Sequence, residues 1–283
     1  MAGVSTKEIK NRIRSMESTR QITKAMEMVA ASKLRRAQAQ VLSSRPYFEI
    51  LYSTIADIAS SNRDFSSPYL QERPVKKALY IVIAGDRGLA GGYNSNILKL
   101  VQSEIAGKDA EVLPIGKKAL DFFRQHGAEI LTDGYAVAGE VSVGDCFSAA
   151  KLLCRRFVAG EFTQVQLIYT HFASVLSQLP SELELLPVRI SEHKDRTPKK
   201  FVLYESGPLS VFDAIVPEYL GGLLYGALCE SVASEQAARR MAMDSATKNA
   251  EDMIDDLSLK YNRARQGAIT QEITEIVAGA ESS

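Results

Sequence analysis

The chain has 283 residues, enough for a sizeable hydrophobic core and for two structural units. Its 34 basic residues balance 34 acidic ones, so net charge gives no argument for binding to nucleic acid or to acidic lipid. The three cysteines, Cys146, Cys154 and Cys229, form no C-x-x-C pair, and such a sparse set is typical of reduced thiols in a cytosolic compartment.

The N-terminus, MAGVSTKEIKNRIR, carries charges within its first ten residues and has no apolar run, so we predict no signal peptide. The acidic residues Glu8 and Glu17 also argue against a transit peptide. No uninterrupted apolar run approaches the roughly 20 residues of a membrane-spanning helix. We therefore expect a soluble chain, which can still dock on a membrane complex.

The N-terminal segment predicts one long helix, since no glycine occurs between Gly3 and Gly85. Its apolar residues recur at spacings of three, four and six, close to the 3.5-residue repeat of a coiled coil. This predicted stripe consists of Ile9, Ile13, Met16, Ile22, Met26 and Val29, and continues through Ala30, Leu34, Ala37 and Val41. Pro46 predicts a kink, after which YFEILYSTIADIA resumes a helical pattern.

The middle of the chain, from about Pro74 to about Arg196, alternates between strand and helix patterns. The predicted strands are KKALYIVIAG, AEVLPIG, AEIL, QVQLIYTHF and LELLPVRI. The predicted helices are NSNILKLVQSEI, KKALDFFRQ and VGDCFSAAKLLCRRFVAG. Such alternation predicts a Rossmann-like, mostly parallel α/β domain. The polar segment SEHKDRTPKK that follows predicts an exposed linker to the last helix.

The C-terminal segment predicts a second long helix, because residues 227–278 contain no proline and only one glycine, Gly267. Its predicted stripe consists of Ala246, Ala250, Met253, Leu257, Tyr261, Ala264 and Ala268. Residues 1–45 hold ten basic and three acidic residues, whereas residues 209–283 hold six and twelve, so the two ends have net charges of +7 and −6.

Two long helices with narrow stripes and opposite charge are suited to pairing. We therefore predict that the two ends form an antiparallel coiled coil. The predicted segments are 1–60 for the first coiled-coil helix, 74–200 for the central α/β domain and 208–283 for the second coiled-coil helix. Ordinary solvated helix faces are the alternative.

The stretch AGDRGLAGGYNSN, residues 84–96 and hereafter the glycine loop, joins a predicted strand to a predicted helix. A P-loop would need a Gly-Lys pair, but the only cation in this stretch is Arg87. The spacing of its glycines also fails the G-x-G-x-x-G dinucleotide pattern. A structural or contact loop is therefore favoured over a nucleotide site.

No other pattern predicts a catalytic or metal site. The three histidines, His126, His171 and His193, lie far apart and show no zinc-binding spacing. Cys146 and Cys154 predict buried structural thiols, and the carboxylates of DMIDD predict a solvated helix face. We expect no enzyme activity, no metal and no cofactor.

The last turns of the C-terminal helix, hereafter the tip (residues 267–278), carry Ile269, Ile273, Ile276 and Val277. These apolar residues have no obvious partner in the chain if the N-terminal helix is shorter. A helix end with such apolar residues predicts insertion into a cavity of another protein. Folding of the tip onto its own α/β domain is the alternative.

Four motifs together resemble the gamma-subunit family of F-type ATP synthases over essentially the whole chain. They are TRQITKAMEMVAASKLRRAQ, DRGLAGGYN, EQAARRMAM and YNRARQGAITQEITEIVAGA. The resemblance implies a rotor shaft that couples ion-driven rotation of a ring of c subunits to ATP synthesis or hydrolysis. It also implies a non-catalytic subunit that binds no nucleotide itself.

The resemblance further implies the partners: three alpha and three beta subunits around the coiled coil, and epsilon with the c-ring at its foot. It implies a peripheral position at the cytoplasmic face of a bacterial inner membrane, with membrane contact only through the complex. We expect no homo-oligomer and no thiol regulation of the chloroplast kind. A nucleotide-dependent α/β enzyme with helical extensions and a static coiled-coil scaffold stay open as alternatives.

The resemblance also implies contact residues. Those expected to meet the alpha and beta subunits are Met26, Lys33, Arg35, Arg36, Arg87, Arg239, Arg265, Gln266 and Thr270. Tyr204 and Glu205 match the foot that faces the c-ring and epsilon. Arg87 and the basic residues of the first helix are expected to face the acidic levers of the beta subunits.

Overall fold

The computed structural model describes residues 6–61, 66–74, 76–189 and 207–281. They fall into two compact units, one formed by Met1–Ala31 with Arg239–Ser283 and the other by Ser32–Ala238. Two long helices contribute to both units: α1, Thr6–Ser61, and α5, Pro208–Glu281. Pro46 lies inside α1 and Pro217 inside α5, and neither proline ends its helix.

The Ser32–Ala238 unit contains a five-stranded sheet with the order β3-β2-β1-β4-β5. The strands are β1 (Ala78–Ile83), β2 (Ala110–Ile115), β3 (Glu129–Ile130), β4 (Gln164–Phe172) and β5 (Gln178–Leu186). The first four pair in parallel, and β5 joins β4 antiparallel at the edge. The predicted Rossmann-like, mostly parallel α/β domain is therefore confirmed.

The last strand begins and ends earlier than predicted. The pattern LELLPVRI placed it at residues 183–190, whereas β5 pairs Phe172 with Gln178 and ends at Leu186. A short turn over residues 173–177 joins β4 to β5, so the strand starts at Gln178, opposite Phe172. Pro187 has no backbone N–H to donate to the ladder, so pairing stops before it.

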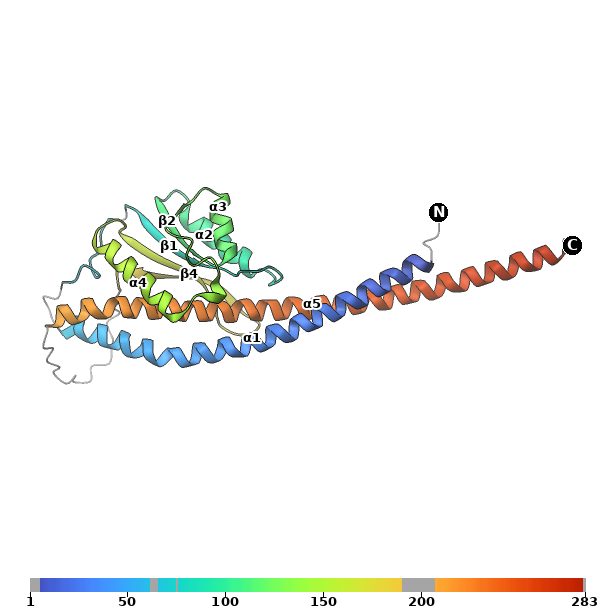
Figure 1. The fold of residues 1–283 in the computed structure, drawn as a ribbon, viewed down its shortest axis with the longest axis horizontal. Helices are drawn as coiled ribbons and strands as arrows, with labels where there is room; N and C mark the ends of the chain where they lie inside the picture. Colours follow the sequence, from blue (N-terminus) through green and yellow to red (C-terminus); the bar gives the residue numbers. More distant parts are fainter. Residues whose placement is uncertain (1–5, 62–65, 75, 190–206, 282–283) are drawn as a thin grey trace. The chain divides into compact units, whose positions relative to one another are not determined.

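Helices cover both faces of the sheet (Figure 1). Helices α2 (Tyr93–Ile105) and α3 (Lys117–Gln125) pack against one face, where Tyr80 and Val82 of β1 contact their apolar side chains. On the other face, Leu79 and Ile81 pack with α4 (Val143–Val158) and with the part of α5 in this unit. All six residues of β1 are buried, as expected for a central parallel strand covered on both sides.

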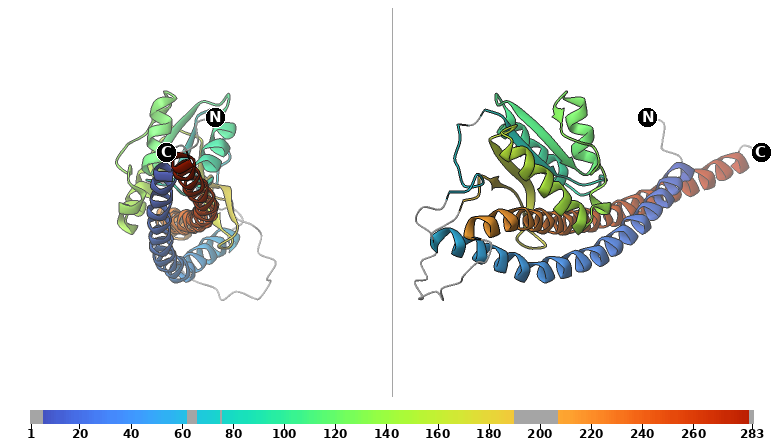
Figure 2. Two further views of the ribbon diagram at one scale, coloured as in Figure 1. Left: turned by 90° about the vertical axis from the view of Figure 1, so that its right-hand side faces the viewer. Right: turned by 60° about the vertical axis from the view of Figure 1, so that its left-hand side comes forward.

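Within each unit, α1 and α5 lie side by side and run in opposite directions (Figure 2). In the Ser32–Ala238 unit, Leu34 and Ala37 pack with Ala233 and Ala237. In the other unit, the hydroxyls of Thr23 and Thr247 lie 2.8 Å apart. The predicted antiparallel pairing of the two chain ends is therefore confirmed.

The residues that form the seam differ in part from the predicted stripes. Ile22, Val29 and Met253 are 57%, 55% and 51% exposed. Thr23 on α1 and Met243 and Thr247 on α5 are buried instead, whereas Ala30 and Ala250 are buried as predicted. The spacing of six between Met16 and Ile22 is one residue short of the seven-residue repeat, so the predicted stripe on α1 moves onto a neighbouring face after Met16.

Helix α5 contains, between Pro208 and Ala278, a window of 18 residues that is apolar enough to pass as a membrane span by length and composition alone. Half of the relevant window is buried inside the protein, however, as in the core helix of a globular fold. No uninterrupted apolar run of that length occurs in this segment, since Glu218 and Glu230 bracket its most apolar part. Packing against the sheet accounts for its composition.

Candidate functional site

The described residues contain no group of three or more His, Cys, Asp or Glu side chains that could hold a metal ion. Both described histidines have structural partners. His126 lies 2.8 Å from the carbonyl oxygen of Phe122, and Nδ1 of His171 lies 2.6 Å from a carboxylate oxygen of Glu230. His193 lies outside the described residues. Neither described histidine has a nucleophile beside it among these contacts.

The three thiols are buried, as predicted for Cys146 and Cys154. Burial, with a smaller contribution from nearby Cys229, raises the pKa of Cys146 to about 12, and burial raises the pKa of Cys154 to about 12. Because the reactive form of cysteine is the thiolate, these groups are poor nucleophiles near neutral pH. Their position in the core between the sheet and α5 indicates a packing role.

The glycine loop is a polar turn that satisfies its own hydrogen bonds. The backbone N–H of Gly85 donates to Oδ1 of Asn94 at 2.8 Å, and Nδ2 of Asn94 donates to the carbonyl of Arg87 at 3.2 Å. The carboxylate of Asp86 accepts from the backbone N–H groups of Lys117, Ala138 and Gly139 at 2.8 to 3.2 Å. Side chains of the chain thus use donors that would face a bound phosphate, which favours the structural interpretation.

The middle of this loop is exposed to solvent. Arg87, Gly88 and Leu89 are exposed, and Leu89 is 64% exposed in a left-handed conformation with a φ of 61°. An apolar residue in that conformation is unusual, and exposure of both an arginine and a leucine suits contact with another protein.

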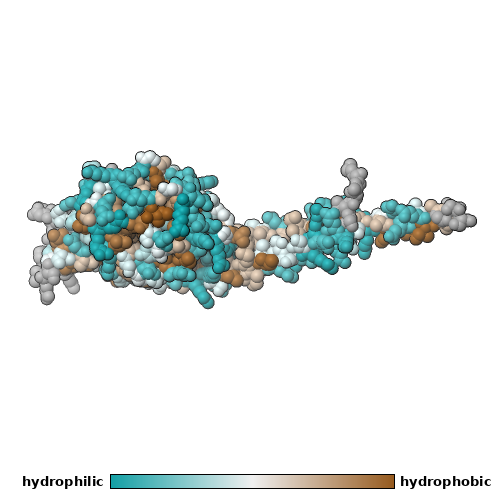
Figure 3. All heavy atoms as spheres, turned by 45° about the horizontal axis from the view of Figure 1, so that its top comes forward, coloured by the Kyte–Doolittle hydropathy of each residue, from teal (hydrophilic) through white to brown (hydrophobic). Residues whose placement is uncertain are grey.

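The tip is exposed along its apolar side. Ile269, Ile273, Ile276 and Val277 are 47%, 56%, 71% and 51% exposed, and apolar atoms gather near the C-terminal end of α5 in Figure 3. Residues Thr23 and Thr247 face each other, so the antiparallel register places Thr6 opposite about residue 264. The tip thus extends past the first described residue of α1, as predicted for an end that another protein covers.

The residues implied as contacts lie on both units. Met26 is half-buried and Arg239 partly buried, while Arg265, Gln266 and Thr270 are exposed; all five lie in the Met1–Ala31 and Arg239–Ser283 unit. Lys33, Arg35, Arg36 and Arg87 are exposed in the Ser32–Ala238 unit. Tyr204 and Glu205 lie outside the described residues. The contacts of all these residues stay predictions.

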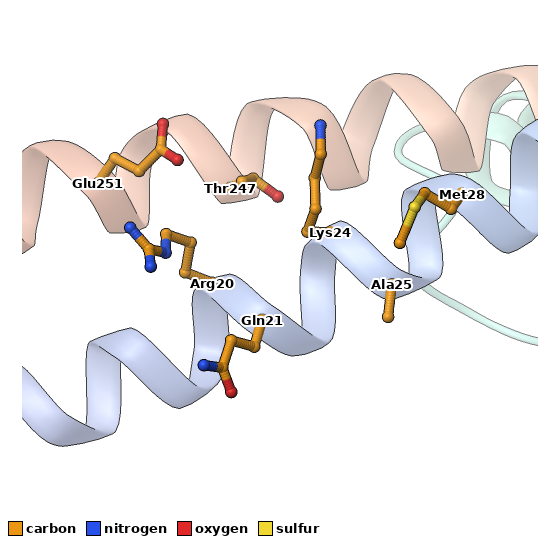
Figure 4. A pocket seen from close by; sticks show the side chains of 7 residues that line it. All are labelled: Arg20, Gln21, Lys24, Ala25, Met28, Thr247 and Glu251. Carbon is orange, nitrogen blue, oxygen red and sulfur yellow. The ribbon is translucent and has the colours of Figure 1, made fainter.

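A shallow groove on the coiled coil was not predicted from the sequence. It is lined by Arg20, Gln21, Lys24, Ala25 and Met28 of α1 and by Thr247 and Glu251 of α5. Figure 4 shows the side chains of Arg20 and Lys24 extending toward α5, Arg20 on the side of Glu251 and Lys24 on the other side of Thr247. Glu27 hydrogen-bonds to Lys24 at 2.9 Å and raises the pKa of this lysine, and Asp244 and Glu251 raise it further. The largest effect on Lys24 thus comes from α1 itself, and the α5 carboxylates Asp244 and Glu251 add smaller contributions across the groove.

The fold and these surfaces define a class of protein: an α/β domain packed on an antiparallel pair of long helices, with an apolar helix end available to another protein. The sequence model of the family described as ATP synthase matches residues 5–282. The chain is 45% identical over 275 residues to the ATP synthase gamma chain of Ruminococcus albus, covering 95% of this chain and 96% of that one. It is 42% identical to the gamma chain of Alkaliphilus metalliredigens, covering 99% of each. The chain belongs to the ATP synthase gamma-chain family.

Solved structures with the same fold come from rotary ATP synthases. The rotor of the Euglena gracilis mitochondrial ATP synthase matches with a TM-score of 0.63 and 20% identity, covering 93% of this chain and 98% of that one. The central stalk and c-ring structure of the Tetrahymena thermophila mitochondrial enzyme matches with a TM-score of 0.58 and 24% identity, covering 80% and 99%. At these identities the likeness supports the fold.

Proposed function

We propose that this chain is the central rotor shaft of an F-type ATP synthase. It couples ion-driven rotation of the c-ring to ATP synthesis or hydrolysis in the ring of alpha and beta subunits, and it does no bond chemistry itself. The observation that carries this function is the match to gamma chains over nearly the whole of both chains, including the exposed tip. The antiparallel helix pair supplies the stiff element that such a role needs.

The partners proposed for this shaft are three alpha and three beta subunits around the coiled coil, with epsilon and the c-ring at the foot. The apolar tip has the chemistry of a helix end held in a sleeve formed by other subunits. Tyr204 and Glu205 are proposed to belong to the foot. The chain is part of the F1 portion of a membrane-attached complex, and we propose the cytoplasmic face of a bacterial inner membrane as its location.

The coupling mechanism follows from contacts that change with the angle of the shaft. A protein shifts the conformational equilibrium of its partner only as far as it binds the alternative conformations with different free energies. Met26, the basic residues Lys33, Arg35 and Arg36, and Arg87 are proposed to contact the beta subunits in some orientations and not in others. Arg239, Arg265, Gln266 and Thr270 are proposed to hydrogen-bond to catalytic-subunit loops in the same angle-dependent way.

Co-purification with alpha and beta subunits, followed by an ATPase assay with and without the chain, tests this function. We expect the chain to join the complex and to change its ATP turnover. Failure of the chain to bind alpha and beta subunits would contradict the proposal. An equilibrium binding measurement with ATP addresses the enzyme alternative, because micromolar affinity of the chain alone would favour an enzyme.

A cross-link separates a rotating shaft from a static scaffold. A cysteine introduced at Arg87 can be joined to a cysteine on a beta subunit, while the native cysteines stay protected by burial. We expect the joined complex to lose ATP turnover and to regain it on reduction. Unchanged turnover in the joined complex would favour the scaffold.

A further inference from the structure

A buried carboxylate on α5 lies against the glycine loop. Glu235 is only 8% exposed, in a stretch of α5 where Ala233 and Ala237 are fully buried. A Cβ atom added to Gly85 would lie 2.9 Å from both the carboxyl carbon and Oε1 of Glu235. It would also lie 3.1 Å from Oδ1 of Asn94. The carboxylate thus lies close to the backbone of Gly85, two residues after the end of β1.

This is the place where related strand-turn-helix arrangements bind an anion. In such folds the glycine after the first strand lets a phosphate approach the backbone, and the N-terminus of the next helix attracts its negative charge. Here β1 ends at Ile83, Gly85 follows, and α2 begins at Tyr93. The negative group found beside Gly85 belongs to the chain itself and is carried by α5.

The surroundings hold this carboxylate close to the start of α2. Tyr93 is buried beside it; burial raises the pKa of the Tyr93 hydroxyl, and the charge of Glu235 raises it further. Nearby, Oγ of Ser231 on α5 accepts from the backbone N–H of Thr170, and Oγ of Ser234 donates to the Thr170 carbonyl. Ser231 and Ser234 therefore join α5 to β4, on the same helix as Glu235.

We propose that Glu235 is a positioning residue. Its carboxylate occupies the place beside Gly85 where related folds bind an anion. It thereby holds the glycine loop, including Arg87, against α5. Asn94 completes the connection, since it accepts from the N–H of Gly85 and donates to the carbonyl of Arg87. The consequence for coupling rests on the proposed rotor function. A loop fastened to the shaft can push a partner subunit, whereas a loop that swings freely cannot bias the partner's conformations.

Substitution of Gly85 tests the anchor, because Gly88 in the same loop provides a matched control. A Cβ at Gly88 would meet no heavy atom within 4 Å, whereas Gly85→Ala must displace the Glu235 carboxylate. In the complete enzyme reconstituted in vesicles, we expect Gly85→Ala to lower ATP-driven ion pumping per ATP hydrolysed by roughly threefold or more, and Gly88→Ala to leave it unchanged. Hydrogen exchange of the loop amides in the same complex should rise only in Gly85→Ala.

The second variant is the rescue, Gly85→Ala with Glu235→Asp. Aspartate withdraws the carboxylate by one methylene and makes room for the new methyl group. We expect the double variant to pump better than Gly85→Ala alone, a non-additive effect that general loss of stability would not produce. Equal ion pumping and equal loop exchange in Gly85→Ala and Gly88→Ala would overturn the proposed role of Glu235. Additive losses of pumping in the double variant would overturn it as well.

Ion pumping and hydrogen exchange of the loop amides, measured on the same complex, keep this inference separate from the proposed function. Faster loop exchange in Gly85→Ala with normal coupling would overturn the role of Glu235 in coupling. If the unmodified complex and Gly88→Ala both lack pumping that depends on this chain, the rotor function fails, and loop exchange alone decides the anchor.

Discussion

At the scale of single residues, the seam of the coiled coil contains a polar pair where an apolar one would be expected. Thr23 and Thr247 are buried, and their hydroxyl oxygens lie 2.8 Å apart. Each hydroxyl is also within 3.1 Å of a carbonyl oxygen of its own helix, Arg20 for Thr23 and Met243 for Thr247. A buried polar contact of this kind favours one register of a coiled coil over its alternatives.

Replacing one of the two threonines should cost more than replacing both. Thr23→Val removes a hydrogen bond and leaves one hydroxyl with its own carbonyl only, which we expect to cost about 1 kcal/mol of unfolding free energy. The pair Thr23→Val with Thr247→Val places two methyl groups in contact and should recover part of that loss. Urea unfolding of the full chain, followed by circular dichroism, measures the unfolding free energy of both variants. Equal stability of Thr23→Val and the wild type would contradict the expectation.

The buried thiols give a second prediction at this scale. Burial raises the pKa of Cys146 and Cys154 to about 12, so below that pH both are mainly protonated in the folded chain. We expect neither to react with iodoacetamide at about pH 8, and both to react once urea exposes them. Mass spectrometry of the modified peptides is the measurement, and rapid labelling of either cysteine in the folded chain would show that the core around α4 opens.

At the scale of elements, periodicity predicted the helices, four of the five strands and the pairing of the chain ends. Periodicity failed to predict the seam residues where the more hydrophobic of two neighbouring residues is not the one that faces the other helix. Ile22 is more hydrophobic than Thr23, yet the seam contains Thr23, because the facing helix fixes which side of α1 is covered. The same reason places Met253 outside the seam, and only the partner helix could reveal it.

The tip gives the prediction for an element. Ile273→Asp with Ile276→Asp should change the stability of the chain alone by less than about 0.5 kcal/mol, because both side chains are more than half exposed. Assembly with alpha and beta subunits should weaken by roughly tenfold or more, since each buried isoleucine contributes about 1.5 to 3 kcal/mol. Leu176→Asp, at a leucine 79% exposed in the turn before β5, is the control. Equal assembly of the tip variant and the control would contradict a covered tip.

At the scale of the whole molecule, local patterns could not predict the contact between the glycine loop and α5. Glu235 and Gly85 are 150 positions apart in the sequence, and each fits its own segment without the other. The available signal in the sequence was an acidic residue in the alanine-rich stretch ASEQAA, residues 233–238. The division of the chain into segments 1–60, 74–200 and 208–283 stays a prediction, as do the partner contacts of the basic residues.

The role of the molecule in its complex gives the last prediction. Met26 is half-buried on α1, where the shaft is proposed to meet the base of the catalytic ring. Met26→Lys places a cation there, and because a partly buried charge is costly without an acceptor, it should bind to a beta-subunit group that normally has another partner. We expect normal assembly and normal or near-normal ATP hydrolysis, but a clear loss of ATP-driven ion pumping.

Met26→Leu conserves volume and should pump normally, so the contrast between the two variants isolates the effect of the charge. Unchanged pumping by Met26→Lys would show that this position does not take part in coupling.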